Sequence, residues 1–380
     1  MFNLYIIGAG FSKEAKLPLG KEFFNLILDK AKNKYLPDGS NLYRNILKPD
    51  IENFLDYINS TKFKSLPIKE DQINFEEFIS FLDIEHFLRL RGSDQWSDIG
   101  NRSQILIRNL IADILNYRLS LVTNTEFELY KSFLKRLEPN DYITTFNYDN
   151  LIENCLDDLR KNYRLFPYRS EPDGSSFIND EIVILKMHGS IDWFDISGFE
   201  NSIKYAAINK DYYIPKHTIF SNPEIFQPTK IVDNSYIGDE YLKKIYKVKN
   251  LNEYFKKTSL VIEAPLIVSP SFSKVLYLNP LKEFWNGFSN EGLTNRKVVI
   301  IGFSLSAHDE YLKQPIYKLI YNFQNYERDY YKKSRLKIID LAENTKEIKN
   351  FKKRYSFVNW RRADCYFNGF NKESIEMIFN

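Results

Sequence analysis

The amino-acid sequence predicts an α/β protein built on a parallel sheet. Short apolar runs, each too short to be a free helix, recur along the chain at 3–7, 141–146, 182–187, 266–269, 297–301 and 336–339. Helical periodicity separates most of these runs, and several runs end directly on glycine or on a small polar residue. Strands that alternate with helices pair in parallel, with right-handed crossovers that place helices on both faces of the sheet. We therefore expect a Rossmann-like parallel sheet.

Helical patterns follow several of the predicted strands. A helix over residues 11–32, interrupted near Pro18, follows the first strand, and helices over 150–160 and 309–325 follow two later strands. Residues 195–260 are rich in Tyr and Lys with scattered Pro. We expect irregular elements in that segment, which line or cover a site.

One long segment shows only helical patterns. Between residues 40 and 138 no strand pattern occurs, and the apolar residues within 73–88 and 107–115 recur mainly at helical spacings. We therefore expect residues 1–39 and 139–380 to form one α/β domain that is interrupted by a helical insertion over residues 40–138.

Length and composition are those of a globular protein. The chain has 380 residues, with 43% hydrophobic and 27% charged residues, which is enough for a large core and excludes a wholly disordered chain. No apolar run approaches the length of a membrane-spanning helix, and the first residues lack the basic region of a signal peptide. We expect a cytoplasmic protein with no membrane partner.

Charge and cysteine content narrow the possible partners. The net charge of +3 is too balanced to predict a nucleic-acid or membrane partner. Residues 328–362 nevertheless hold twelve Lys or Arg against four Asp or Glu, which is typical of a solvated face or, alternatively, of a surface for nucleic acid or an acidic partner. Only Cys155 and Cys365 are present, so a disulfide framework and a four-thiolate zinc site are excluded.

A glycine turn follows the first predicted strand, with the sequence Gly8-Ala9-Gly10-Phe11-Ser12. In a parallel sheet such a turn lets backbone N–H groups approach a phosphate at the start of a helix. The third glycine of the usual dinucleotide fingerprint would fall at Lys13, which argues against an ordinary dehydrogenase. The alternative is a glycine turn that serves packing only.

Polar residues follow the strand over 141–146. Asn147 and Asp149 come at the carboxyl edge of the sheet, where Asn147 could hold a ribose hydroxyl or a water and Asp149 could accept from an amide such as that of nicotinamide. The alternative is that these residues only cap the following helix.

Two further strands end on residues suited to a ligand site. His188-Gly189 follows the strand over 182–187, and a histidine there can act as a general base at neutral pH. Gly302 and Ser304 follow the strand over 297–301 and suit a phosphate or a ribose. The other histidines, at 86, 217 and 308, are weaker candidates. Because the strand ends share one edge, we expect these residues to form one ligand site.

The ordered set of motifs resembles the sirtuin NAD-binding fold, and most closely the bacterial sirtuin-like NADases of antiphage defence. The resemblance rests on Gly8-Ala9-Gly10-Phe11-Ser12, on 146–153, on 185–193 and on 300–312. It implies that Ala9, Gly10 and Ser12, next to Gly8, hold the diphosphate and the neighbouring ribose.

The resemblance also implies roles for the remaining strand ends. Asn147 would position the ribose and the attacking water, Asp149 would bind the carboxamide, and His188 would be the general base. The adenosine side would be held by Gly302 and Ser304, with Asp340 as a further ribose-binding candidate.

The resemblance implies an NAD⁺ glycohydrolase that releases nicotinamide and ADP-ribose in abortive infection. It further implies a homo-oligomer with a HerA-type ATPase as partner, no cofactor beyond NAD⁺ as substrate, and a helical insertion that covers the nicotinamide end of the cleft. Two cysteines cannot form the zinc module of protein-deacylating sirtuins, so we expect no zinc and no deacylation. The alternative is a sensor that binds NAD or ADP-ribose without cleaving it, or a nucleic-acid-associated subunit of a defence complex.

Overall fold

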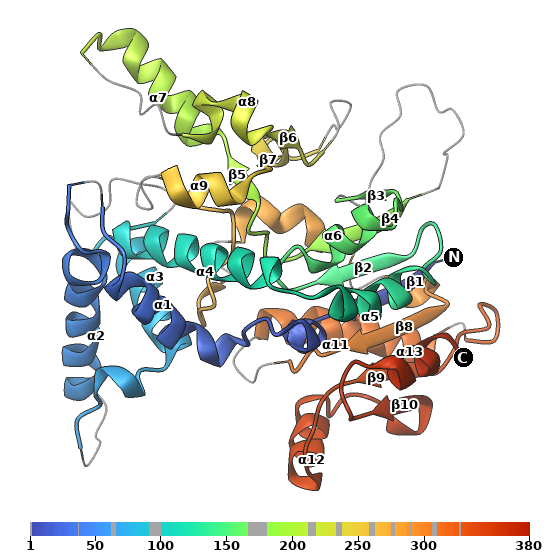
Figure 1. The fold of residues 1–380 in the computed structure, drawn as a ribbon. Helices are drawn as coiled ribbons and strands as arrows, with labels where there is room; N and C mark the ends of the chain where they lie inside the picture. Colours follow the sequence, from blue (N-terminus) through green and yellow to red (C-terminus); the bar gives the residue numbers. More distant parts are fainter. Residues whose placement is uncertain are drawn as a thin grey trace.

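A seven-stranded sheet forms the centre of the protein in a computed structural model (Figure 1). The strand order is β10-β9-β8-β1-β2-β4-β3, and neighbouring strands are parallel throughout. The expected Rossmann-like parallel sheet is therefore confirmed. The structure describes residues 2–36, 38–61, 66–90, 100–165, 181–211, 218–232, 238–257, 263–274, 278–286, 288, 291–305, 310–326 and 328–380.

The strands of this sheet are short and mostly apolar. Their bounds are β1 Asn3–Ile7, β2 Tyr142–Thr145, β3 Tyr163–Arg164, β4 Ile182–Lys186, β8 Lys297–Ile301, β9 Leu336–Ile339 and β10 Ala363–Tyr366. Every residue of β1 from Leu4 to Ile7 is fully buried. Because successive side chains in a strand point to opposite faces, the sheet is covered on both sides at β1.

Helices connect and cover the strands. Their bounds are α1 Phe23–Lys32, α2 Lys48–Thr61, α3 Phe75–Phe87, α4 Arg102–Ser120, α5 Asn124–Leu134, α6 Leu151–Asp158, α7 Ser197–Ile208, α8 Pro223–Phe226, α9 Leu251–Lys257, α10 Glu291–Thr294, α11 Glu310–Asn325, α12 Thr345–Arg354 and α13 Lys372–Phe379. No described helix is long and apolar enough to cross a membrane.

All described elements between residues 41 and 134 are helical, as the periodicity predicts. Asn101 caps the start of α4: its side chain accepts from the Gln104 N–H at 2.9 Å, while the Gln104 side chain accepts from the Asn101 N–H at 2.8 Å. Such reciprocal capping satisfies two N–H groups that the helix itself leaves open. Most of α4 is buried, because it packs against α1, α3 and α9.

An aromatic cluster joins α5 and α13 to the sheet. The Phe133 ring of α5 lies 5.5 Å from Tyr5 of β1 and 5.8 Å from Phe379 of α13, between ring centroids. Phe11, just after the glycine turn, packs against Tyr130 at 5.0 Å. Buried aromatic side chains contribute large apolar areas, so this cluster fixes the glycine turn against α5.

The strand ends fall in one row. Ile7 pairs with Thr145 on one side and with Ile301 on the other, and these pair in turn with Lys186 and Ile339. These five residues each end a strand, so the segments that follow β1, β2, β4, β8 and β9 all start at the same edge. The chain places β2 and β4 on one side of β1 and later β8 on the other, so the strand order reverses between β1 and β8. Ligands bind at such a reversal in open parallel sheets.

Several parts of the chain differ from the sequence-based expectation. Where the sequence predicts the first part of a helix over 11–32, the structure has a 3-10 helix over Ala9–Ala15, and α1 begins only at Phe23. The predicted strand over 266–269 is wrong: the segment makes only an isolated antiparallel bridge between Ile267 and Gly189, because it crosses the turn after β4 instead of joining the sheet. Within 195–260, the expected irregular segment contains β6 (Thr229–Lys230) and β7 (Ile245–Lys247), which form a small antiparallel sheet with β5 (Trp193–Asp195).

Candidate functional site

A cleft of about 390 Å³ follows the row of strand ends. This volume falls within the range of small-molecule sites in proteins. All ten residues predicted from the sequence line the cleft: Gly8, Ala9, Gly10, Ser12, Asn147, Asp149, His188, Gly302, Ser304 and Asp340. The rings of Phe146 and Phe303 also line it and stack on each other with centroids 4.5 Å apart. The structure therefore brings the predicted residues together from five strands.

The glycines of the two turns are required by direct contact between the turns. The Gly8 N–H donates to the Ile301 carbonyl at 3.0 Å, and the Gly10 N–H donates to the Gly302 carbonyl at 2.9 Å. Gly302 has φ +59°, and a Cβ there would lie 2.3 Å from the Phe11 nitrogen. The glycine turn therefore serves packing, which is the alternative considered from the sequence. The N–H groups of Gly8 and Gly10 already donate hydrogen bonds to backbone carbonyls of the other turn and its strand.

Asn147, Ser12 and Asp149 form one hydrogen-bonded cluster. The Asn147 amide donates to the Gly8 carbonyl and to Ser12 Oγ, both at 3.1 Å, and the Ser12 hydroxyl donates to Asp149 Oδ2 at 3.1 Å. Ser12 is 2% exposed, and Asn147 and Asp149 are each 8% exposed. Both N–H groups of the Asn147 amide therefore bind protein atoms, and its Oδ1 is the amide atom that can accept from a ligand.

Asp149 also serves the start of α6, as the capping alternative predicts. Its Oδ1 accepts from the Leu151 N–H at 3.1 Å, while Oδ2 faces Ser12 in the cleft. Burial raises the pKa of the Asp149 carboxyl, and the nearby Lys186 ammonium opposes this rise. One carboxylate thus holds the helix start and faces the cleft.

His188 lines the cleft and is almost fully buried. It is 6% exposed, its ring stands 5.2 Å from that of Phe146, and its Nε2 lies 2.7 Å from the Tyr311 hydroxyl. Burial lowers the pKa of His188 to about 3, and the Lys274 ammonium adds to this effect. The imidazole is therefore neutral at physiological pH.

The segment 266–268 holds the turn that contains His188. The Val268 N–H donates to the His188 carbonyl at 2.9 Å, and the Ser190 N–H donates to the Leu266 carbonyl at 3.0 Å. Gly189 has φ +79°, and a Cβ there would lie only 1.9 Å from the Leu266 oxygen. The glycine after His188 therefore permits close passage of another part of the chain.

Ser304 follows β8 and Asp340 follows β9. In the sheet these two strands lie on one side of β1, and β4, whose turn carries His188, lies on the other side. The Arg354 Nε donates to the Ser304 carbonyl at 2.6 Å, which ties α12 to the turn after β8. Asp340 Oδ1 accepts from the Leu341 N–H at 2.8 Å, and burial raises the pKa of this carboxyl.

Sequence reasoning missed two residues beside His188. Lys274 is 5% exposed and lines the cleft, while Tyr311 comes from the second position of α11. Neither lies at a strand end. Tyr311 falls within the 300–312 motif, but the resemblance implied no role for it, and no motif contains Lys274. Of the weaker histidine candidates, His86 lies on α3, away from the cleft lining, and positions 217 and 308 lie outside the described residues.

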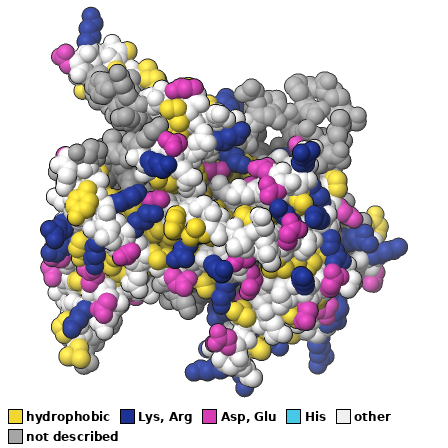
Figure 2. All heavy atoms as spheres, viewed as in Figure 1, with side chains coloured by type: hydrophobic (Ala, Val, Ile, Leu, Met, Phe, Trp, Pro, Cys, Tyr) yellow, Lys and Arg dark blue, Asp and Glu magenta, His cyan; other side chains and the backbone are white. Residues whose placement is uncertain are grey.

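Part of the basic segment is used inside the protein. At least six of its twelve cations bind protein acceptors in the described part of the chain: Arg328, Lys333, Arg335, Lys337, Arg354 and Arg362. Exposed Lys346, Lys349, Lys352 and Lys353 lie on α12. Basic and acidic side chains are interspersed on the face that Figure 2 shows.

The cysteines are not part of the cleft lining. Cys155 is buried, which raises the pKa of its thiol to about 12, and Cys365 is partly buried; both are free thiols. Within the described ranges, no group of three or more His, Cys, Asp or Glu side chains is placed to hold a metal ion.

No protein-family model and no curated protein matches the chain. Solved structures with some likeness to it are those of sirtuins, or Sir2 enzymes. A structure on sirtuin substrate affinity has 12% identity and a TM-score of 0.28, and covers 99% of this chain and 92% of that one. A structure on the mechanism and regulation of Sir2 enzymes has 12% identity and a TM-score of 0.31, covering 99% and 90%. Sir2Tm bound to a propionylated peptide has 12% identity and a TM-score of 0.29, covering 100% and 92%.

Proposed function

We propose that the protein is an NAD⁺ glycohydrolase, which cleaves the bond between nicotinamide and ribose and releases ADP-ribose. The observation that carries the proposal is the common cleft of the strand ends, which all ten residues predicted for NAD binding and cleavage line. In the proposed arrangement the diphosphate lies toward the glycine turns. The nicotinamide end lies toward Asn147, Asp149 and His188, under the helical insertion over residues 40–138.

The chemistry needs few catalytic groups. Cleavage passes through a cationic, oxocarbenium-like state of the ribose, as in glycoside hydrolysis, but nicotinamide leaves as a neutral molecule and needs no acid to protonate it. Asn147 Oδ1 holds a ribose hydroxyl or the attacking water, and Asp149 accepts from the carboxamide. His188 takes the proton, and a positioned base typically contributes about 10² to 10⁴ in rate.

The electrostatics support His188 as a base that is weak at rest. Its pKa of about 3 keeps the ring neutral, as a base requires, but lies far below the pKa that suits proton transfer at neutral pH. The negative diphosphate of NAD⁺ would raise the pKa of His188, opposite to the effect of Lys274. The full activity is thus proposed to need bound substrate and an activated state.

The biological role follows from the resemblance to antiphage NADases. The protein acts as a defence effector that depletes NAD in abortive infection, as a homo-oligomer with a HerA-type ATPase as partner. Control by such a partner fits a site that is weak at rest, because unregulated NAD loss would kill the host.

The test is to incubate the purified protein with NAD⁺, with and without the candidate ATPase, and to quantify every nicotinamide product. Equal amounts of nicotinamide and ADP-ribose support the hydrolase. Intact NAD⁺ recovered after saturable binding favours the sensor, and transfer of an acyl group to ADP-ribose from an acylated peptide favours a deacylase. If NAD⁺ is neither bound nor consumed under any activating condition, the proposal fails.

A further inference from the structure

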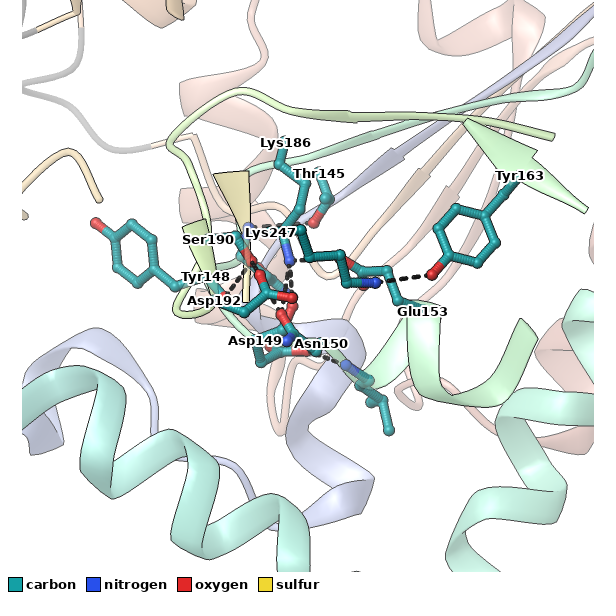
Figure 3. A network of polar contacts seen from close by, with 12 residues as sticks. Thr145, Tyr148, Asp149, Asn150, Glu153, Tyr163, Lys186, Ser190, Asp192 and Lys247 are labelled. Atoms are coloured by element: carbon teal, nitrogen blue, oxygen red, sulfur yellow. Dashed lines mark hydrogen bonds and ion pairs between the residues drawn. The ribbon is translucent and has the colours of Figure 1, made fainter. Parts of the chain in front are cut away.

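A buried ion pair joins the end of β4 to α6, the helix that follows β2 (Figure 3). Lys186, the last residue of β4, stands two positions before His188. Its Nζ donates to the Asp149 carbonyl at 2.7 Å and lies 2.7 Å from Glu153 Oε1 on α6. The side chains of Lys186 and Glu153 are 0% and 2% exposed. The strand that carries His188 is thus tied to the turn that carries Asp149.

A second path links the same two turns. Lys186 Nζ also donates to Asn150 Oδ1 at 3.2 Å. The Ser190 hydroxyl, two positions after His188, lies 2.9 Å from the same oxygen and 2.6 Å from Asp192 Oδ1. Figure 3 shows these side chains converging around the Lys186 ammonium. The residues on both sides of His188 therefore contact the segment that follows Asn147.

Stability alone does not account for this pair. Moving two charges out of water is costly, and buried ion pairs can often be replaced by apolar residues with no loss of stability. Glu153 Oε2 has no hydrogen-bond partner in the described part of the chain, so the pair is not fully satisfied. In some proteins a buried ion pair fixes a geometry that apolar packing would not.

We propose that Lys186 is a positioning residue, which fixes the spacing between Asn147 and Asp149 on the β2 turn and His188 on the β4 turn. The inference rests on the proposed NAD⁺ chemistry, in which these two turns act on the same ribose. Misplacement of reacting groups by about 1 Å can cost about 10²-fold in rate. Lys186 itself touches no substrate in this account.

The test replaces both partners at once, with Lys186→Met and Glu153→Met in one variant. The double change removes both charges together, but it also removes the donor to the Asp149 carbonyl and to Asn150 Oδ1, so we expect a folded protein with a slightly lower unfolding midpoint than the wild type. We also expect kcat/KM for NAD⁺ to fall about 10- to 100-fold. A double variant that is stable and cleaves NAD⁺ at the wild-type rate overturns the positioning role, because a merely structural pair is restored by apolar packing.

A lysine elsewhere in the fold provides a matched control. Lys337 is also buried, and its Nζ donates to the Met377 carbonyl at 2.6 Å at the end of α13. Lys337→Met should lower stability but leave kcat/KM of the folded protein unchanged. If the double methionine variant does not fold, Asn150→Ala serves as a second variant. It removes only the hydrogen bonds that Lys186 and Ser190 make to Asn150 Oδ1. It should lower kcat/KM about three- to tenfold, and wild-type activity of that variant would overturn the inference.

Ligand binding separates this inference from the proposed function. ADP lacks both the nicotinamide and the ribose on which the two turns act, so its stabilisation of the protein against heat should be equal in the wild type and the double variant. Stabilisation by NAD⁺ should be smaller in the double variant. A wild type that neither binds nor cleaves NAD⁺ defeats both proposals. Equal NAD⁺ cleavage and binding by the wild type and the double variant defeats only the positioning role.

Discussion

The Nε2 atom of His188 lies 2.7 Å from the hydroxyl of Tyr311. The ring also donates to the Phe146 backbone carbonyl, so we assign the proton of the neutral imidazole to Nδ1. The Tyr311 hydroxyl then donates to Nε2. The atom that would take a proton from substrate is therefore already hydrogen-bonded, and α11, which carries Tyr311, holds the base at rest.

Removing the Tyr311 hydroxyl should release this atom. A typical hydrogen bond contributes about 1 kcal/mol, so we expect Tyr311→Phe to raise the basal rate of nicotinamide release roughly fivefold. The measurement is the steady-state rate without any activating partner. A fall in rate to the level of a variant that lacks His188 would instead make Tyr311 part of the proton path.

The depressed pKa of His188 predicts a pH dependence of stability. Between pH 6.5 and about 3 the unfolded chain binds a proton on this histidine that the folded protein does not, so the free energy of unfolding falls as the pH decreases through this range. Urea unfolding at pH 7.5 and 5.5 should show a larger loss in the wild type than in His188→Gln. Parallel losses in the two proteins would contradict the buried, neutral state of His188.

The raised pKa of Glu263 should make the stability change with pH in the direction opposite to that of His188. It lies against the Ile219 N–H at 3.2 Å, and burial raises the pKa of its carboxyl to about 7. Between about pH 4.5 and 7 the folded protein holds a proton that the unfolded chain has lost, so the stability due to this group falls as the pH rises. Glu263→Gln should therefore be more stable than the wild type at pH 8, by about 2 kcal/mol, and should lose most of this advantage at pH 5. Thermal unfolding at the two pH values measures the difference.

The contact between the glycine turns predicts a large effect of one methyl group. Gly302→Ala would place Cβ 2.3 Å from a backbone nitrogen at φ +59°, whereas Gly39→Ala, at φ +82°, meets no atom within 4 Å. Gly39→Ala should cost only the backbone strain, roughly 1 to 2 kcal/mol. Gly302→Ala should cost several kcal/mol more in unfolding free energy, and equal losses would show that the turns do not need this contact.

The sequence was sufficient to predict four strand ends to within one residue, because the apolar runs over 3–7, 141–146, 182–187 and 297–301 mark buried parallel strands. It could not show that 266–269 leaves the sheet, since a short apolar run looks the same in a strand and in a segment that crosses a turn. The pairing of Lys186 with Glu153, and the place of Tyr311 beside His188, depend on tertiary packing. No spacing in the sequence encodes them.

The most direct test of the central claim is nicotinamide release by matched histidine variants. In the presence of the activating partner, the wild type should release nicotinamide and ADP-ribose in equal amounts. His188→Ala and Asn147→Ala should each lower the rate by about 10²-fold or more. His86→Ala, on α3 away from the cleft lining, should retain the wild-type rate. Cleavage of NAD⁺ by His188→Ala and Asn147→Ala at the wild-type rate would contradict the account.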